Sequence, residues 1–156
     1  MIAATDAAGF SIEDYDPRAG AILPIEAAAA AVATAKQAGG DLVLTARAEN
    51  HLRGVDDLDD TIARLIAYRD AGADVVYAPG ITTAADIERL VTAVACPVNV
   101  LALPGTPTIQ ELAALGVARV SVGSLFAWAA YGALVSAAAE LLGPGTSTYI
   151  AGVVPG

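Results

Sequence analysis

The stretch "GFSIEDYD", residues 9–16, joins an apolar run to a cluster of acids and decides how the fold is interpreted. Its first half, with Phe10 and Ile12, has the character of a buried β-strand, and it ends on the carboxylates Glu13 and Asp14. Functional side chains gather at the carboxyl ends of parallel strands. No cation stands beside these acids in the sequence, so we expect them to face a metal or substrate site.

Four similar apolar runs follow this stretch, and amphipathic segments separate them. Helical spacing of apolar residues predicts helices that begin near Leu58, Thr83 and Thr108, and a last helix over residues 125–142. Thr108 and Glu111 have the spacing of a capping box. The alternation is typical of βα units around a parallel sheet, and no linker interrupts residues 1–156, which predicts a single domain. The predicted strands cover residues 9–13, 41–46, 74–78, 98–103 and 119–122.

Five βα units in a row are compatible with two architectures. One is an open, doubly wound sheet. The other is a (β/α)₈ barrel, which needs eight strands and typically about 250 residues. Composition leaves both open.

The composition excludes several classes of partner. The net charge of −9, with eight Lys and Arg, repels phosphate backbones, so we do not expect nucleic acid binding. Residues 125–142 are apolar but mostly alanine and include Glu140, which favours a packed helix over a membrane span. The single cysteine, Cys96, fits a reducing compartment, and we expect a cytoplasmic protein.

Polar residues at the predicted strand ends form the candidate site. Glu13 ends the first strand, and Arg47 and Glu49 end the second. Carboxylates beside a guanidinium suit a hard cation such as Mg²⁺ and a planar anion such as a carboxylate, although an ordinary ion pair has the same spacing. Gly123 and Ser124 precede the last helix, where they could seat an anion or form a tight turn with Ser124 as the helix cap.

Five motifs together resemble the isocitrate lyase/phosphoenolpyruvate mutase superfamily, in particular its compact phosphonomutase-like and carboxyvinyl-carboxyphosphonate phosphorylmutase-like members. The resemblance implies an α/β barrel of the TIM type, of which this chain would contain strands four to eight and the C-terminal helix. It also implies a Mg²⁺-dependent lyase or mutase that acts on a C–C or P–C bond of a 2-oxo acid or phosphonate through an enolate-like intermediate. The motifs are "GFSIEDYD", "LVLTARAEN", "AYRDAGADVVYAPG", "CPVNVLALPG" and "GVARVSVGS" followed by "AAYGAL".

The resemblance also assigns roles to individual residues. Glu13 corresponds to a carboxylate that holds Mg²⁺ through water, Arg47 to the arginine that binds the substrate carboxylate, and Glu49 to an acid that orients the catalytic site. From their positions on the predicted strands and at the strand ends, Asn99, Gly123 and Ser124 are expected to bind substrate.

Two departures from the family pattern limit these expectations. The family's main aspartate ligands for Mg²⁺ lie upstream of the segment that matches this chain, so we expect the chain alone to be inactive. Pro79 and Gly80 replace a carboxylate that the lyases carry. The last helix resembles one that family members exchange between subunits, which implies a homo-oligomer. The alternative is a non-catalytic remnant or interaction module with an open sheet.

Overall fold

The computed structural model describes residues 6–153, and these residues form two compact units. The first unit ends at Ser121 and the second begins at Val122. This division does not test the expectation of a single domain, which stays a prediction.

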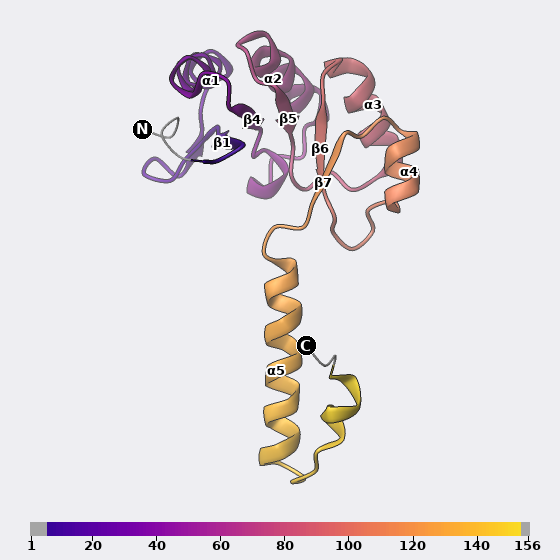
Figure 1. The fold of residues 1–156 in the computed structure, drawn as a ribbon. Helices are drawn as coiled ribbons and strands as arrows, with labels where there is room; N and C mark the ends of the chain where they lie inside the picture. The colour runs from indigo at the N-terminus through magenta and orange to yellow at the C-terminus, as the bar shows by residue number, and fades with distance from the viewer. Residues whose placement is uncertain (1–5, 154–156) are drawn as a thin grey trace. The chain divides into compact units, whose positions relative to one another are not determined.

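The first unit contains a parallel sheet of five strands (Figure 1). Each neighbouring pair in the sheet is parallel, as the alternation of strands and helices predicts. The α/β class with about five βα units is thus confirmed, although most strands are shorter than predicted. The strand order is β1 (Gly9–Glu13), β4 (Val43–Arg47), β5 (Val75–Tyr77), β6 (Val98–Leu101) and β7 (Arg119–Ser121).

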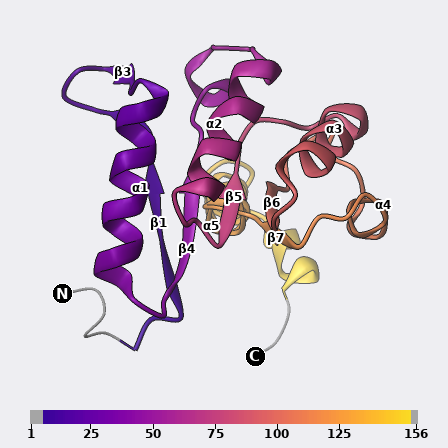
Figure 2. The same cartoon turned by 90° about the horizontal axis from the view of Figure 1, so that it is seen from above.

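Four helices connect these strands, and the views in Figures 1 and 2 place them along the sheet. They are α1 (Ile25–Gly39), α2 (Leu58–Asp70), α3 (Ala84–Val94) and α4 (Ile109–Ala114). The predicted capping box at Thr108 is confirmed, because its hydroxyl accepts from the backbone N–H of Glu111 while the Glu111 carboxylate accepts from that of Thr108. Helix α1 escaped the sequence analysis because alanines occupy most sides of it and obscure its apolar stripe.

Alternation along the strands decides what lies on each side of the sheet. Successive side chains of a strand point to opposite sides. Leu44, Ala46, Val76 and Val98 point toward the helices and form a core with side chains such as Leu65 of α2. The residues between them in sequence point to the other side, and this second side carries the polar residues described below.

Two short elements lie beyond the carboxyl ends of β1 and β4. The strands β2 (Tyr15–Asp16) and β3 (Ala21–Ile22) form an antiparallel hairpin after β1, which the sequence analysis did not predict. A 3₁₀ helix, η2 (His51–Arg53), follows β4. The Arg53 guanidinium carbon lies 3.5 Å from the centre of the Tyr15 ring, so the two elements are in contact.

The second unit consists of α5 (Leu125–Leu142) and the 3₁₀ helix η3 (Thr148–Gly152). Helix α5 has the predicted bounds, and the Glu140 carboxylate joins it to η3 by accepting from the backbone N–H of Tyr149 at 3.0 Å. No residue of α5 is buried within this unit, and the expectation that the helix packs stays a prediction. Among the described residues, α5 is the helix whose length and apolar composition would allow it to cross a membrane, which is weak support for a span.

Candidate functional site

The side of the sheet opposite the helices carries one continuous row of polar residues. The strand register pairs Glu13 with Arg47, Arg47 with Tyr77, Tyr77 with Asn99, and Asn99 with Arg119. Residues paired across parallel strands point to the same side. Three residues that the sequence predicted for the site, Glu13, Arg47 and Asn99, therefore belong to one row.

Arg47 is held in the row by two carboxylates and one aromatic ring. Its Nη1 lies 2.8 Å from Glu13 Oε1, and its Nη2 lies 2.8 Å from Glu49 Oε1. Its Nε donates to the same Glu49 oxygen at 2.9 Å, and its guanidinium lies 5.2 Å from the centre of the Tyr77 ring. A guanidinium has five N–H groups, and these contacts use three of them, so two remain for a ligand.

Glu49 is a buried acid beside this guanidinium. Its side chain is only 2% exposed, whereas that of Glu13 is 42% exposed. Burial raises the pKa of Glu49 above the ordinary carboxyl value, although the charge of Arg47 opposes this effect. The ion pair with Arg47 and the raised pKa therefore belong to the same side chain.

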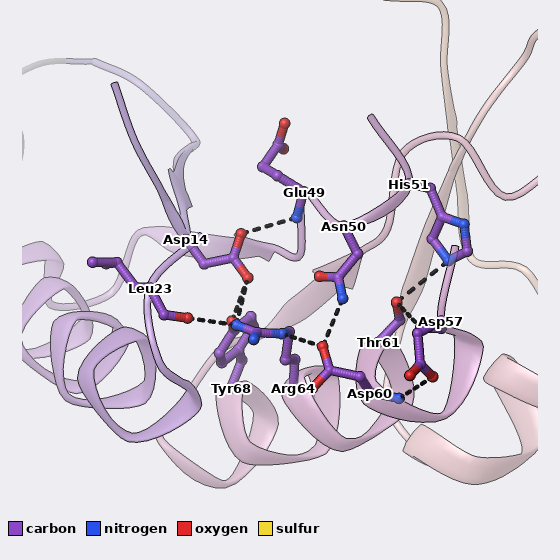
Figure 3. A network of polar contacts seen from close by, with 10 residues as sticks. All are labelled: Asp14, Leu23, Glu49, Asn50, His51, Asp57, Asp60, Thr61, Arg64 and Tyr68. Atoms are coloured by element: carbon purple, nitrogen blue, oxygen red, sulfur yellow. Dashed lines mark hydrogen bonds and ion pairs between the residues drawn. The ribbon is translucent and has the colours of Figure 1, made fainter. Parts of the chain in front are cut away.

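Asp14, in contrast, lies on the helix side of the sheet (Figure 3). Its Oδ2 accepts a hydrogen bond from Tyr68 Oη at 2.6 Å, and its Oδ1 accepts from the backbone N–H of Glu49 at 2.9 Å. Arg64 Nη1 lies 3.4 Å from Oδ2. The expectation that Glu13 and Asp14 face one site is wrong for Asp14, because successive residues at the end of β1 point to opposite sides of the sheet.

A second carboxylate extends this network along α2. Asp60 Oδ2 accepts from Arg64 Nε and from Asn50 Nδ2, both at 2.6 Å (Figure 3). Arg64 also donates to the backbone oxygen of Leu23 at 2.7 Å. Burial opposes the ionisation of Asp60, but the hydrogen bonds from Arg64 and Asn50 outweigh it and lower the pKa of Asp60. Asp14, which accepts from the backbone of Glu49, and Asn50, which follows Glu49 in the sequence, are therefore both held by hydrogen bonds to charged groups.

Asn99 lies buried in the row, where its Nδ2 donates to Ser121 Oγ at 2.9 Å. Its Oδ1 has no hydrogen-bond partner among the described residues. Gly123 and Ser124 belong to the second unit, so the prediction that they bind the same ligand stays untested. Ser124 precedes α5 without capping its backbone, and its Oγ accepts from Trp128 Nε1 at 2.9 Å instead.

The carboxylates do not complete a metal site. No group of three or more His, Cys, Asp or Glu in residues 6–153 could hold a metal ion. Asp14 is engaged with Tyr68, and Glu49 with Arg47. Glu13 is the exposed carboxylate of the row and is the residue that could approach a cation through water.

Tyr77 is a residue of the row that the sequence analysis did not select. It is the last residue of β5 and is 8% exposed. Its place in "DVVYAPG", directly before the loop that follows the strand, is the signal that could have identified it. The predicted strand covered residues 74–78, so its carboxyl end was placed at Pro79 and Gly80 instead.

Comparison with known proteins identifies one family, and the matches cover most of this chain. The family model for phosphoenolpyruvate phosphomutase matches residues 1–142. The crystal structure of a candidate lyase/mutase from Burkholderia cenocepacia J2315 is 52% identical, with a TM-score of 0.91, and covers 96% of this chain and 56% of that one. The structure of an oxaloacetate acetylhydrolase in complex with its product oxalate is 26% identical, with a TM-score of 0.74, and covers 94% and 54%.

A curated relative is similar over much of the chain. An uncharacterised protein of Mycobacterium tuberculosis (strain CDC 1551 / Oshkosh) is 38% identical over 125 residues, which cover 80% of this chain and 47% of the relative. The chain therefore spans about half the length of the curated relatives that it matches.

The hydrogen bond from Tyr68 to Asp14 should contribute measurably to stability. We expect Tyr68→Phe to lower the free energy of unfolding by about 1.5–3 kcal/mol, because Asp14 is buried and loses a short, charge-assisted donor. Urea unfolding followed by circular dichroism measures the change. Tyr149→Phe, in η3 and outside the Asp14 network, is the control and should change stability by less than about 0.5 kcal/mol. A Tyr68→Phe value as small as the control would contradict the assignment.

Glu49 should give the stability a characteristic pH dependence. Its pKa is raised in the folded state, so its contribution is fully present below the ordinary carboxyl pKa and is lost as the pH rises through the raised value. Glu49→Gln removes this titration. We therefore expect the stability of the variant relative to the wild type to increase between pH 4 and pH 7.

Urea unfolding at a series of pH values measures this difference. Glu88→Gln, on the exposed surface of α3, controls for the loss of one negative charge. A difference between Glu49→Gln and the wild type that stays constant or decreases over this range would mean that the raised pKa of Glu49 is wrong.

Proposed function

The chain belongs to the phosphoenolpyruvate phosphomutase family, and from this membership we propose that it takes part in lyase or mutase chemistry on a 2-oxo acid or phosphonate. The bond in question is a C–C or P–C bond, and the reaction passes through an enolate-like intermediate. The observation that carries the proposal is the Arg47 guanidinium, which is fixed by Glu13, Glu49 and Tyr77 and keeps two N–H groups for an anion.

Arg47 binds the carboxylate or phosphonate of the substrate. Two parallel N–H groups match two oxygens of such an anion, and charge-assisted bonds of this kind are strong and directional. Glu49 lies against the same guanidinium and exchanges a proton with the bound substrate, which its raised pKa supports. Asn99 is in the same row and contributes a polar contact.

The charge of the site imposes a condition on anion binding. Glu13 and Glu49 carry two negative charges when both are ionised and Arg47 carries one positive charge, so the three groups sum to −1. An incoming anion is repelled by this negative charge unless a proton on Glu49 or a cation near Glu13 neutralises it. We include Mg²⁺ in the proposal on this ground, with Glu13 as its water-mediated contact. The remaining ligands would have to come from outside the described residues.

A second candidate function is a non-catalytic interaction module with an open sheet. The lack of a complete metal-binding cluster among residues 6–153 favours it. Such a module would use the row of polar residues only as a solvated surface. It would bind neither Mg²⁺ nor a small dianion with measurable specificity.

Binding of oxalate distinguishes these two functions. Oxalate is a planar dianion that resembles an enolate of a 2-oxo acid, and one relative was solved with it. By isothermal titration calorimetry we expect the wild type to bind oxalate more tightly with MgCl₂ than without it. Arg47→Ala should weaken binding about tenfold to hundredfold because it removes charged hydrogen bonds.

Arg89→Ala is the matched control, because Arg89 is an exposed arginine that pairs with Asp59 on the surface. It should bind oxalate as the wild type does. No binding by the wild type would favour the non-catalytic module, whereas equal binding by Arg47→Ala would place the anion elsewhere.

We also propose that α5 mediates a homo-oligomer. Its exposed apolar side chains support this, since a solvated helix would be expected to carry more polar residues. They include Phe126, Trp128, Tyr131, Leu134 and Val135.

Light scattering coupled to size-exclusion chromatography tests the contact. We expect the wild type to have a mass above the 15.6 kDa of one chain. Leu134→Asp, at a residue that is 64% exposed, should shift it toward the monomer by placing a charge in the apolar contact. Ser136→Asp adds the same charge at an exposed polar residue and should have a smaller effect. A monomeric wild type would exclude the proposal.

A further inference from the structure

Arg53 lies in η2, the 3₁₀ helix that follows β4, and the roles assigned above do not use it. Its backbone N–H donates to the backbone oxygens of Glu49 at 3.1 Å and of Asn50 at 3.0 Å, so it is one turn beyond the buried acid of the site. The carboxyl ends of β1 and β4 are paired in the parallel sheet. Arg53 is therefore at the same edge of the sheet as Glu13 and Arg47, the edge at which α/β folds bind their ligands.

The Tyr15 ring fixes the orientation of the Arg53 guanidinium. Tyr15 is two residues beyond Glu13, which is no more than about 7 Å along an extended chain. The Arg53 guanidinium carbon lies 3.5 Å from the centre of the Tyr15 ring, a separation at which the planar group stacks on the face of the ring. A stacked guanidinium keeps its N–H groups at its edges, where they remain free to bind an anion.

Arg53 is a cation whose donors are unused. It is exposed, and its guanidinium has no observed hydrogen bond or ion pair within residues 6–153. Arg47, in contrast, uses three of its five N–H groups on Glu13 and Glu49. The charges of these three groups sum to −1, and the +1 of Arg53 brings the sum to zero. This edge of the sheet thus offers an anion a second guanidinium, which no carboxylate neutralises.

We propose that Arg53 is a second anion-binding residue of this site and selects ligands that carry two separated acidic groups. The inference rests on the proposed function, in which Arg47 holds the carboxylate or phosphonate at one end of the ligand. Arg53 holds the anionic oxygens at the other end, through charge-assisted hydrogen bonds. Tyr15 is a positioning residue, because it contacts Arg53 and not the ligand.

Dianions of different length test the proposal. Oxalate has its two carboxylates on adjacent carbons and can be held by Arg47 alone, whereas succinate has two CH₂ groups between them and can contact both guanidinium groups. By isothermal titration calorimetry in MgCl₂ we expect Arg53→Ala to weaken succinate binding about tenfold or more and oxalate binding less than about twofold, because only succinate loses charged hydrogen bonds. 3-Phosphonopropionate, with a phosphonate in place of one carboxylate, should also bind the variant more weakly, and the larger of the two losses identifies the group that Arg53 holds.

Two further variants separate a direct contact from general charge and show the role of the ring. Arg18→Ala removes the same charge at an exposed residue between β2 and β3, and it should bind succinate as the wild type does. Tyr15→Leu keeps the charge of Arg53 but removes the aromatic face that orients it. It should weaken succinate binding about twofold to fivefold, the size of an exposed cation–π contact, and leave oxalate binding unchanged.

The outcomes separate this inference from the function on which it rests. If the wild type binds oxalate and Arg47→Ala does not, but succinate binds Arg53→Ala normally or does not bind at all, only the role of Arg53 is overturned. Equal losses for oxalate and succinate in a folded Arg53→Ala variant would also overturn it, since they indicate that Arg53 only holds the hairpin against η2. An equal loss of succinate binding in Arg18→Ala would indicate long-range charge and overturn it too. A wild type that binds none of the three dianions overturns the proposed function together with the inference.

Discussion

The buried carboxylate of Asp14 is the constraint on which the arrangement of the site depends. Asp14 directly follows β1, and its carboxylate points to the helix side of the sheet. An unpaired charge buried there would be costly. Tyr68 and Arg64 of α2 and the backbone N–H of Glu49 supply the donors that offset this cost. One carboxylate therefore fixes three segments at once: the end of β1, the segment after β4 and helix α2. Glu49 can lie beside Arg47 because its own backbone is held by Asp14.

One side of the sheet holds the structure together, and the other side carries the residues of the candidate site. Apolar residues and the Asp14 network lie between sheet and helices, where they hold the elements together. Charged and hydrogen-bonding residues in register lie on the other side, with Arg47 between two carboxylates and above an aromatic ring. The guanidinium is thereby oriented before any ligand arrives, which lowers the entropic cost of binding an anion. The cost of this arrangement is a negative local charge, which a dianionic ligand must overcome.

Much of the fold and part of the site could be predicted from the sequence, for identifiable reasons. Continuous apolar runs at regular intervals identify parallel strands, and the Thr108 capping box is a local signal that needs no tertiary context. Glu13 and Arg47 were predicted because charged residues end apolar strands. The sequence did not predict that Glu13 and Asp14 point to opposite sides of the sheet, because this depends on which side of β1 the helices cover. Tyr77 was missed for a similar reason: a tyrosine in a strand is ordinary until the register places it between Arg47 and Asn99.

The in-register row also limits how such a chain can change during evolution. A substitution alters one member of the row, whereas an insertion or deletion of one residue within β4 or β5 would turn every following side chain to the opposite side of the sheet. Arg47 would then point into the apolar core, and Ala46 or Ala48 would replace it in the row. Changes in length are consequently expected in the segments after the strands, such as the β2–β3 hairpin and η2. These segments can vary in length and composition while the strands beneath them keep their number of residues.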